Sequence, residues 1–395
     1  MNQRASSFSI PLPVRFTPLR IDSVLLLMSV ALLAIGLVML ASSSIGIAEG
    51  NHGEPLFFLK RQLQALVIGF AGAGFMLLVP TDVWENTGPI LLLFGLCLLG
   101  LVLLPGVGTT VNGSTRWVKI AGIGVQVSEP ARLALILYIA GYALRQQASL
   151  RSQFSGLLKP MIVLSFAAML LLMEPDFGAA TVLLATTMIM LFVAGARVRD
   201  FAVISCAGIA AFIALALTSD YRKRRLMGFL DPWADPYDTG FQLTQSHIAI
   251  GRGEWFGVGL GDSVQKLFYL PEAHTDFVFA VFAEEFGLLG VTLLVGLFLF
   301  FVLRILRLAK LAAENGQWFQ AYVALGIGVW LGLQAFINIG VNAGLLPTKG
   351  LTLPLISYGR SSIIIVMTAI GLLLRIHHEV SGSAAPPSVR KGKRS

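Results

Sequence analysis

The sequence is poor in charged side chains and almost free of cysteine. Only 13% of its 395 residues are Asp, Glu, Lys or Arg, whereas soluble domains carry about 25%. The 29 basic and 21 acidic residues are too few to cover a soluble core of this size. Cys97 and Cys206 both lie in apolar runs, so a disulfide framework and a thiolate metal cluster are excluded. These shortages exclude an ordinary water-soluble enzyme, and they exclude disordered, collagen-like and coiled-coil chains as well.

Long apolar runs, in contrast, are abundant, because 56% of the residues are hydrophobic. A helix needs about 20 apolar residues to cross the roughly 30 Å of a bilayer's hydrocarbon core. We therefore predict an all-α integral membrane protein with about ten transmembrane helices and one long exofacial loop between helices 7 and 8. The predicted spans are residues 22–43, 63–79, 88–104, 130–145, 160–173, 178–195, 200–219, 277–303, 319–342 and 361–376. The first is longer than a signal-peptide core and is predicted to remain as an uncleaved anchor.

The charges between the spans predict the orientation in the membrane. Lys and Arg in the short connections concentrate on the side that holds the N-terminus, so both termini are expected in the cytoplasm. The chain then divides into a cytoplasmic N-terminal segment (1–21), a membrane domain (22–376) and a basic, disordered cytoplasmic tail (377–395). The exofacial loop 220–276 is far longer than the others, and loops of this length usually bind or catalyse. Functional residues are therefore expected on the exofacial side.

Several basic side chains occupy exofacial positions. Arg222 and Arg225 stand at the start of the long loop, where the positive-inside rule disfavours them. Arg116, Lys119 and Lys349 lie in other exofacial segments. Guanidinium groups pair well with phosphate oxygens, so these residues are candidates for binding a phosphate-bearing ligand. A solvated loop entrance beside lipid head groups is the alternative, and the pattern leaves both open.

An acidic stretch closes the long loop. Glu272, His274 and Asp276 directly precede the eighth predicted span. Burial at an apolar boundary raises the pKa of a carboxyl group and makes it a better proton acceptor, while nearby cations lower that pKa, so the direction of the shift stays open. The alternative role is an N-cap, in which Thr275 or Asp276 satisfies the first amides of the helix.

Polar residues also occur inside two of the spans. Glu284 and Glu285 are costly in hydrocarbon and must face protein, water or a partner, which favours a structural hydrogen-bonding role. Gln334, Asn338 and Asn342 recur every fourth residue and so line one helix face. Hydrogen bonding between helices is the simpler interpretation of that face, and a polar wall of a substrate groove is the alternative.

Taken together, these motifs resemble one known family, the SEDS (shape, elongation, division and sporulation) peptidoglycan glycosyltransferases, over residues 20–376. The motifs are Asn112-Gly113 with Arg116-Trp117, Gln126 with Ser128-Glu129, Glu174-Pro175-Asp176, Asp231-Pro232 through Gln242, Leu270 to Phe277 with Glu284 to Gly287, Pro347 to Gly350, and Leu353 to Gly359. The chain is more similar to the cell-division branch than to the elongation branch, since Ala273 stands where the latter commonly has a basic residue. It departs from the family pattern at Val127, Arg132, Arg252 and Arg360.

The resemblance implies polymerisation of lipid II, an undecaprenyl-pyrophosphoryl disaccharide-pentapeptide, on the outer face of the bacterial cytoplasmic (inner) membrane at the division septum. In the implied mechanism Asp276 accepts the proton of the acceptor hydroxyl in a single inverting displacement. Cations stabilise the departing pyrophosphate, and a divalent ion (Mg²⁺ or Mn²⁺) is an open alternative, although no cluster has metal-ligand spacing. The cations are Arg116, Lys119, Lys349, Arg222 and Arg225; the other substrate-binding candidates are His274, Glu272, Trp117 and Ser357; the polar membrane residues are Glu129, Glu284, Glu285, Gln334, Asn338 and Asn342.

The resemblance also implies partners: a class B penicillin-binding protein transpeptidase and the division proteins FtsQ, FtsL and FtsB. No nucleic acid is expected. Two other functions compete with polymerisation. One is a transporter that flips the lipid-linked precursor, and the other is a scaffold without chemistry. Charged groups at the outer boundary rather than at the midplane, and the lack of an internal repeat, favour the enzyme.

Overall fold

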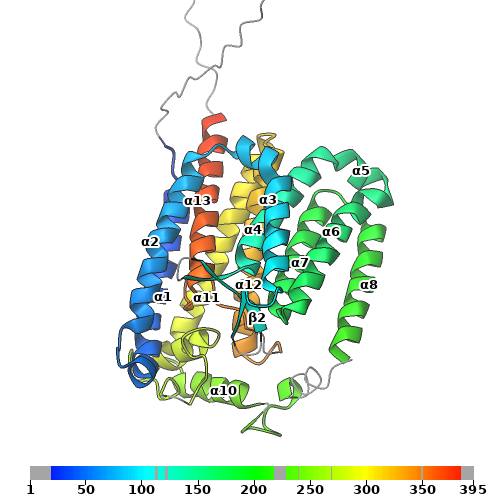
Figure 1. The fold of residues 1–395 in the computed structure, drawn as a ribbon. Helices are drawn as coiled ribbons and strands as arrows, with labels where there is room; N and C mark the ends of the chain where they lie inside the picture. Colours follow the sequence, from blue (N-terminus) through cyan, green and yellow to red (C-terminus); the bar gives the residue numbers. More distant parts are fainter. Residues whose placement is uncertain are drawn as a thin grey trace, which may run out of the picture.

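The computed structural model describes residues 19–111, 114–120, 123–217, 228–238, 240–267, 269–347 and 350–383. Within these ranges the chain is a bundle of long helices (Figure 1). The helices are α1 (Ser23–His52), α2 (Phe57–Leu78), α3 (Thr81–Val102), α4 (Ser128–Arg145), α5 (Gln147–Ser152), α6 (Phe154–Met173), α7 (Phe177–Val193), α8 (Val198–Leu217), α10 (Phe241–Gly253), α11 (Val278–Glu314), α12 (Trp318–Asn342) and α13 (Arg360–Ser383). Every predicted span overlaps one of them.

The prediction of a helical integral membrane protein is confirmed, whereas the number of ten spans is not. Among the described residues, 7 helices are long and apolar enough to cross a membrane, namely α1, α2, α3, α6, α11, α12 and α13. Helix α7 is apolar but shorter. Helix α4 has 18 residues and carries Glu129, Arg132 and Arg145, so its composition does not mark it as a span. Glu129 and Arg132 are buried but form an ion pair at 3.4 Å, and Arg145 at the end of the helix is exposed.

A small sheet between α3 and α4 is a feature that the all-α prediction missed. It consists of β1 (Gly108–Val111), β2 (Ser114–Ile120) and β3 (Ile123–Gln126), paired antiparallel in the order β1-β2-β3. Lys119 pairs with Gly124, and Trp117 pairs with both Thr109 and Gln126. The strands have only 4, 7 and 4 residues, too few for their alternation to stand out beside the long apolar runs.

Helix α12 forms the centre of the bundle. It packs against α4, α7, α11 and α13, while α2 packs along α13 and α3 along α4. Trp330 of α12 is fully buried, whereas Val67 of α2 and Ile90 of α3 are about 70% exposed. Apolar side chains therefore cover the outside of the bundle as well as its core, as expected for a surface that faces lipid.

The two ends of the described chain lie together, on the side of the bundle opposite α10 (Figure 1). The Arg20 amide donates to His378 Nδ1 at 3.1 Å, and Arg20 Nη1 donates to the Ser381 carbonyl oxygen at 2.5 Å. Helix α13 continues past residue 376, where the last span was predicted to end, to Ser383. The first part of the predicted tail is thus helical, and residues 384–395 lie outside the described ranges.

Candidate active site

Asp276 stands at the end of the long loop, two residues before α11 begins at Val278. It does not cap the helix, since the N-cap residue is Phe277 and no side chain makes a cap hydrogen bond. Thr275 Oγ1 instead donates to a Glu272 carboxylate oxygen at 2.6 Å. The cap hypothesis is therefore wrong, and the Asp276 carboxyl group is left available for another role.

Two asparagines of α12 fix the main chain of Asp276. Asn338 Nδ2 and Asn342 Nδ2 donate to its carbonyl oxygen at 2.8 and 3.0 Å. Asn342 Oδ1 also accepts from the Ala280 amide at 3.1 Å, which supplies the capping that the loop residues do not. Both asparagines are buried. The polar face of α12 thus holds the loop end and the start of α11 in place.

The Asp276 carboxylate meets residues from three other segments. A Cβ atom added to Gly350 would stand 3.2 Å from Asp276 Oδ2 and 3.7 Å from Arg116 Nη2, so these three residues meet in one place. Arg116 lies on β2, and its Nη1 is 3.6 Å from Asp176 Oδ2. Asp176 caps α7 by accepting from the Ala179 amide at 3.0 Å. The sheet, the α6–α7 connection, the long loop and the 350–359 segment therefore converge here.

The surroundings of Asp276 make it a better base than a free aspartate. Burial and, to a smaller extent, the charge of Glu272 raise the pKa of Asp276 to about 7 against the opposing effect of Arg116. A general base works best when its pKa lies near the working pH. The sequence left the direction of the pKa shift of Asp276 open, and in the structure the pKa is raised.

Glu174 is a second acid of this site, and only the family motif pointed to it. It is fully buried, and neither carboxylate oxygen has a hydrogen-bond partner among the described residues. Burial and, to a smaller extent, the charge of Asp176 raise the pKa of Glu174 to about 8 against the opposing effect of Arg116. Glu174 is therefore mainly protonated at neutral pH and supplies no counter-charge to Arg116.

His274 and Ser357 organise the loops around Asp276. The His274 ring lies 4.4 Å from Phe58 and 5.7 Å from Tyr358 between ring centroids, and its carbonyl oxygen accepts from the Tyr358 amide at 2.9 Å. Burial lowers the pKa of His274, while nearby Glu272 opposes the shift. Ser357 Oγ accepts from the Leu353 amide at 2.8 Å and closes the turn before α13. Within the described ranges, no hydrogen bond joins either side chain to Asp276.

The predicted cations do not all reach the same place. Arg116 and Lys119 both lie on β2, where the pairing with β1 shifts at Arg116, since Trp117 pairs with Thr109 and Thr115 pairs with Thr110. Arg116 faces Asp276, whereas Lys119 is exposed. Lys349, Arg222 and Arg225 lie outside the described residues.

Several buried polar atoms near Asp276 lack partners in the part of the chain that the structure describes. They are Arg116 Nε, Trp117 Nε1, His274 Nδ1 and both oxygens of Glu174. Buried polar groups are normally hydrogen-bonded, so such a group calls for a ligand, a water or a functional reason. These atoms belong to the segments that converge on Asp276. A substrate bound there could supply the missing hydrogen bonds.

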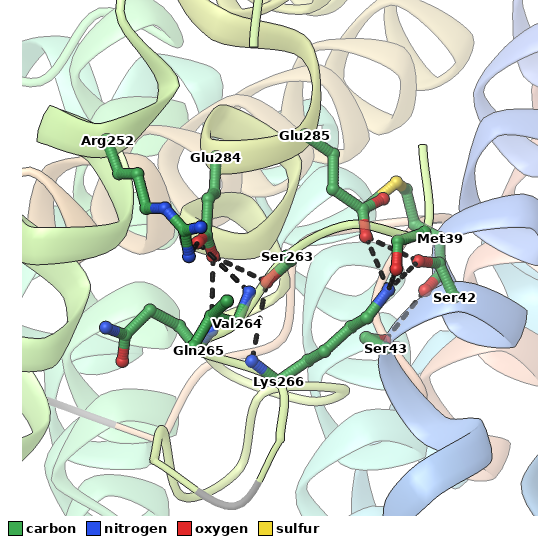
Figure 2. A network of polar contacts seen from close by, with 11 residues as sticks. Met39, Ser42, Ser43, Arg252, Ser263, Val264, Gln265, Lys266, Glu284 and Glu285 are labelled. Carbon is green, nitrogen blue, oxygen red and sulfur yellow. Dashed lines mark hydrogen bonds and ion pairs between the residues drawn. The ribbon is translucent and has the colours of Figure 1, made fainter. Parts of the chain in front are cut away.

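Glu284 and Glu285 hold the long loop against the bundle, and Figure 2 shows the network. Glu284 accepts from Arg252 Nη1 at 3.0 Å, Ser263 Oγ at 2.5 Å and the Val264 amide at 3.1 Å. Glu285 accepts from Lys266 Nζ at 2.8 Å and from Ser42 Oγ of α1 at 2.6 Å. Arg252, considered above for its departure from the family pattern, thus pairs with a protein carboxylate.

The remaining polar membrane residues form a buried cluster inside the bundle. Arg132 Nη1 lies 3.4 Å from a Glu129 oxygen and donates to Gln334 Oε1 at 3.0 Å. Its guanidinium carbon lies 5.3 Å from the centroid of a Trp330 ring. Gln334 also donates to the Thr352 carbonyl oxygen at 3.0 Å. This cluster connects α4 and α12 with the segment that precedes α13.

A metal site does not emerge from the described part of the chain. No three His, Cys, Asp or Glu side chains there lie in an arrangement that could hold a metal ion.

Fold and site together define a multi-pass helical membrane protein whose candidate active site lies at one end of the bundle, beside the membrane-spanning helices. The model of the cell cycle protein family that includes FtsW, RodA and SpoVE matches residues 23–382, and the chain belongs to this family. The resemblance stated from the sequence motifs is thereby confirmed.

Relatives match over almost the whole chain. A probable peptidoglycan glycosyltransferase FtsW of Thioalkalivibrio sulfidiphilus is 57% identical over 360 residues, which cover 91% of this chain and 90% of that protein. A protein of the same description from Legionella pneumophila is 48% identical over 379 residues, with 96% and 95% covered.

Solved structures match the fold over the same length. A chain of a peptidoglycan synthase complex, described as coordinating polymerization and crosslinking, has a TM-score of 0.75 at 28% identity and covers 92% of this chain and 99% of its own. The rod shape determining protein RodA of Thermus thermophilus has a TM-score of 0.68 at 29% identity, with 91% and 98% covered.

Proposed function

We propose that this protein is a peptidoglycan glycosyltransferase that polymerises lipid II into glycan strands at the outer face of the cytoplasmic membrane during cell division. Family membership and relatives described as probable peptidoglycan glycosyltransferases, at 57% and 48% identity over most of the chain, support this function. The observation that carries it is Asp276, whose main chain is fixed by two asparagines and whose carboxyl group has a pKa of about 7 beside Arg116.

In the proposed reaction Asp276 acts as the general base. Its carboxylate takes the proton of the 4-hydroxyl of the acceptor GlcNAc while that oxygen attacks the anomeric carbon of the donor. The bond from the anomeric carbon to the pyrophosphate oxygen breaks, the configuration inverts, and undecaprenyl pyrophosphate leaves with the electron pair. Pyrophosphate is a good leaving group, so a second carboxylic acid is not needed, in contrast to glycoside hydrolysis.

Arg116 is the group best placed to stabilise the leaving pyrophosphate. It lies next to Asp276, and its side chain is 20% exposed, so part of it remains accessible to a ligand. Negative charge grows on the pyrophosphate as the bond breaks, and a preorganised cation lowers the barrier most when it faces that charge. Lys349, Arg222 and Arg225 are further candidates for this role, with Trp117 as a donor to the sugars. Lys119 is exposed, and no contact among the described residues joins it to Asp276, so it is a weaker candidate.

We further propose the arrangement in the membrane and the partners. Both termini lie in the cytoplasm, the long loop faces outward, and the protein works at the division septum. The position of both chain ends opposite α10 is compatible with this orientation. The match to a chain of a peptidoglycan synthase complex supports a class B penicillin-binding protein as partner. FtsQ, FtsL and FtsB are proposed from the division branch of the family.

The test is polymerisation of fluorescent lipid II by the purified full-length protein, alone and with its transpeptidase partner. Asp276→Asn keeps the shape and removes the base, so we expect polymer formation to fall by about 10²- to 10⁴-fold. Asp262→Asn is the matched control, because Asp262 is an exposed acid in the same loop. Polymer formation within a few-fold of wild type in Asp276→Asn contradicts the base assignment. Transfer of lipid II across liposomes without any polymer would favour the transporter instead.

A further inference from the structure

A hollow separates the start of α13 from the first turns of α2. Its lining residues are Arg61, Gln64, Ala65, Ile68 and Arg360; its cavity volume is about 20 Å³, and it is open to the surroundings. The four α2 residues follow the spacing i, i+3, i+4, i+7 and so share one helix face. Arg360 is the first residue of α13 and faces them from the other side.

Two positive charges share this hollow without a carboxylate. Among the described residues, neither Arg61 nor Arg360 forms an ion pair, whereas six other arginines do: Arg116, Arg132, Arg199, Arg252, Arg304 and Arg375. The Arg61 guanidinium lies over the Phe57 ring, 4.1 Å from its centroid. Two like charges that face one hollow repel each other. An anion between the two guanidinium groups would turn this repulsion into attraction.

The walls of the hollow are fixed rather than adaptable. Gln62, next to Arg61, donates to the Ser357 carbonyl oxygen at 3.5 Å and accepts from the Gly359 amide at 3.4 Å. These two bonds connect α2 to the residues directly before Arg360. The distance between the two arginine backbones is therefore set by the fold before any ligand binds, which lowers the entropic cost of binding.

Beside the two arginines the hollow is apolar. Ala65 and Ile68 line it there, and Ile68 is 40% exposed on the surface of the bundle, where a lipid chain can reach it. A ligand that fits both parts carries an anionic head and an apolar chain. We propose that Arg61 and Arg360 bind the phosphate group of an anionic membrane lipid, whose chain runs along α2. This inference does not depend on the proposed glycosyltransferase activity.

The test is lipid retention by the full-length protein in native mass spectrometry. Phosphatidylglycerol and undecaprenyl phosphate are offered separately, and zwitterionic phosphatidylcholine serves as the lipid control. We expect Arg61→Gln with Arg360→Gln to lower the occupancy of both anionic lipids about tenfold or more, because two charge-assisted contacts are lost. Arg61→Lys with Arg360→Lys keeps the charges and should retain most of the binding. Lys60→Gln, which removes an adjacent cation that is already paired with Glu54, should change nothing.

The outcomes separate the sources of the lipid. Stronger retention of undecaprenyl phosphate than of phosphatidylglycerol assigns the hollow to a polyprenyl lipid, and the reverse order assigns it to a bilayer lipid. Both results support the site. Unchanged occupancy in the double Gln variant, or equal retention of phosphatidylcholine by the wild type, overturns it. Thermal unfolding of each variant shows whether the fold is intact. The single substitutions Arg61→Gln and Arg360→Gln show whether each arginine contributes to binding.

Discussion

Asp276 differs from the other acids of the chain in what surrounds its carboxyl group. Glu284 and Glu285 are also buried, yet loop amides, hydroxyls and cations compensate their charges. Asp276 has its main chain fixed by asparagines, while burial raises the pKa of its carboxyl group to about 7. A buried acid without full compensation costs stability, and such groups occur mostly where chemistry needs them.

The raised pKa predicts how the rate depends on pH. Only ionised Asp276 can accept a proton, so the rate should fall about tenfold per unit below pH 7 and level off above it. Initial rates of lipid II polymerisation between pH 5.5 and 8.5 test this. A rate that stays constant from pH 5.5 to 7 would show that no group with this pKa is the base.

Two neighbours should shift the midpoint of that profile in opposite directions. Glu272 raises the pKa of Asp276, so Glu272→Gln should move the midpoint to lower pH. Arg116 lowers the pKa, so Arg116→Gln should move it to higher pH, besides reducing the maximal rate. The same pH series measures both variants. Shifts of equal sign would disprove the electrostatic explanation.

Glu174 gives a prediction about stability. Its pKa is about 8 in the fold, against 4.5 in the unfolded chain. The folded state therefore holds a proton that the unfolded state releases, and stability falls as pH rises between these values, by at most about 1.4 kcal/mol per unit. Glu174→Gln removes this penalty. Its thermal unfolding midpoint should exceed that of wild type at pH 7.5, and the gain should shrink at pH 5.5; a gain that is larger at pH 5.5 contradicts the assignment.

The sequence predicted those single residues whose type and position are unusual by themselves. Asp276 stood out because a carboxylate at the edge of a span is unusual, and the i, i+4, i+8 spacing placed Gln334, Asn338 and Asn342 on one face. That two of these amides hold the Asp276 carbonyl oxygen, and that Lys266 reaches Glu285, depends on contacts between distant segments. No local pattern encodes such contacts.

At the scale of elements, the most unusual is α11, which is two helices joined at Gly287. Gly287 has φ 64° and ψ −167°, a conformation restricted to glycine. The loop around Gly257 fills the break: the Val258 amide donates to the Glu284 carbonyl oxygen at 3.0 Å, and the Leu288 amide donates to the Glu254 carbonyl oxygen at 2.9 Å. The freed backbone groups are thus satisfied by the long loop, as a membrane protein requires.

Filling this break with a side chain should be strongly destabilising. A Cβ on Gly287 would lie 2.4 Å from the Gly257 amide nitrogen, and the positive φ adds strain. We expect Gly287→Ala to cost about 3 kcal/mol or more. Gly296→Ala is the control, because Gly296 lies in the same helix with open space around it, and alanine there should be neutral or stabilising. Thermal unfolding in detergent compares the two, and equal midpoints would contradict the role of the break.

The sequence predicted those elements that are long and apolar. Every predicted span overlaps a helix, because a long apolar run in a membrane protein is almost always a helix. The break at Gly287 was not predicted, since one glycine in an apolar run does not interrupt its hydrophobicity. The β1-β2-β3 sheet was missed for a related reason: its strands are short, and only the contacts of Arg116 reveal why the sheet lies beside Asp276.

At the scale of the whole molecule, the fold places the ends of the chain and the site on opposite sides. Arg20 contacts the end of α13, while Asp276, Arg116 and Gly350 meet at the other end of the bundle. A substrate with a polyprenyl chain can therefore keep its tail in the bilayer while its head group reaches the site. The charge distribution predicted this arrangement, but not which cations reach Asp276.

The proposed orientation can be tested by cysteine labelling in intact cells. After replacement of Cys97 and Cys206, which are both exposed, a cysteine at position 262 should react with a membrane-impermeant maleimide added outside. A cysteine at position 310 should react only after permeabilisation, because Lys310 lies near the opposite end of α11 and is exposed. The reverse pattern would invert the topology and place Asp276 on the cytoplasmic side.

The central claim is that Asp276 moves a proton and does not merely hold substrate. The most direct measurement compares lipid II affinity and polymerisation rate for wild type and Asp276→Asn in the same nanodiscs. We predict that Asp276→Asn binds lipid II with a Kd within about threefold of wild type and polymerises it at a rate at least about 100-fold lower. A Kd that weakens in step with the rate would mean that Asp276 binds substrate instead, and an unchanged rate would remove it from the mechanism.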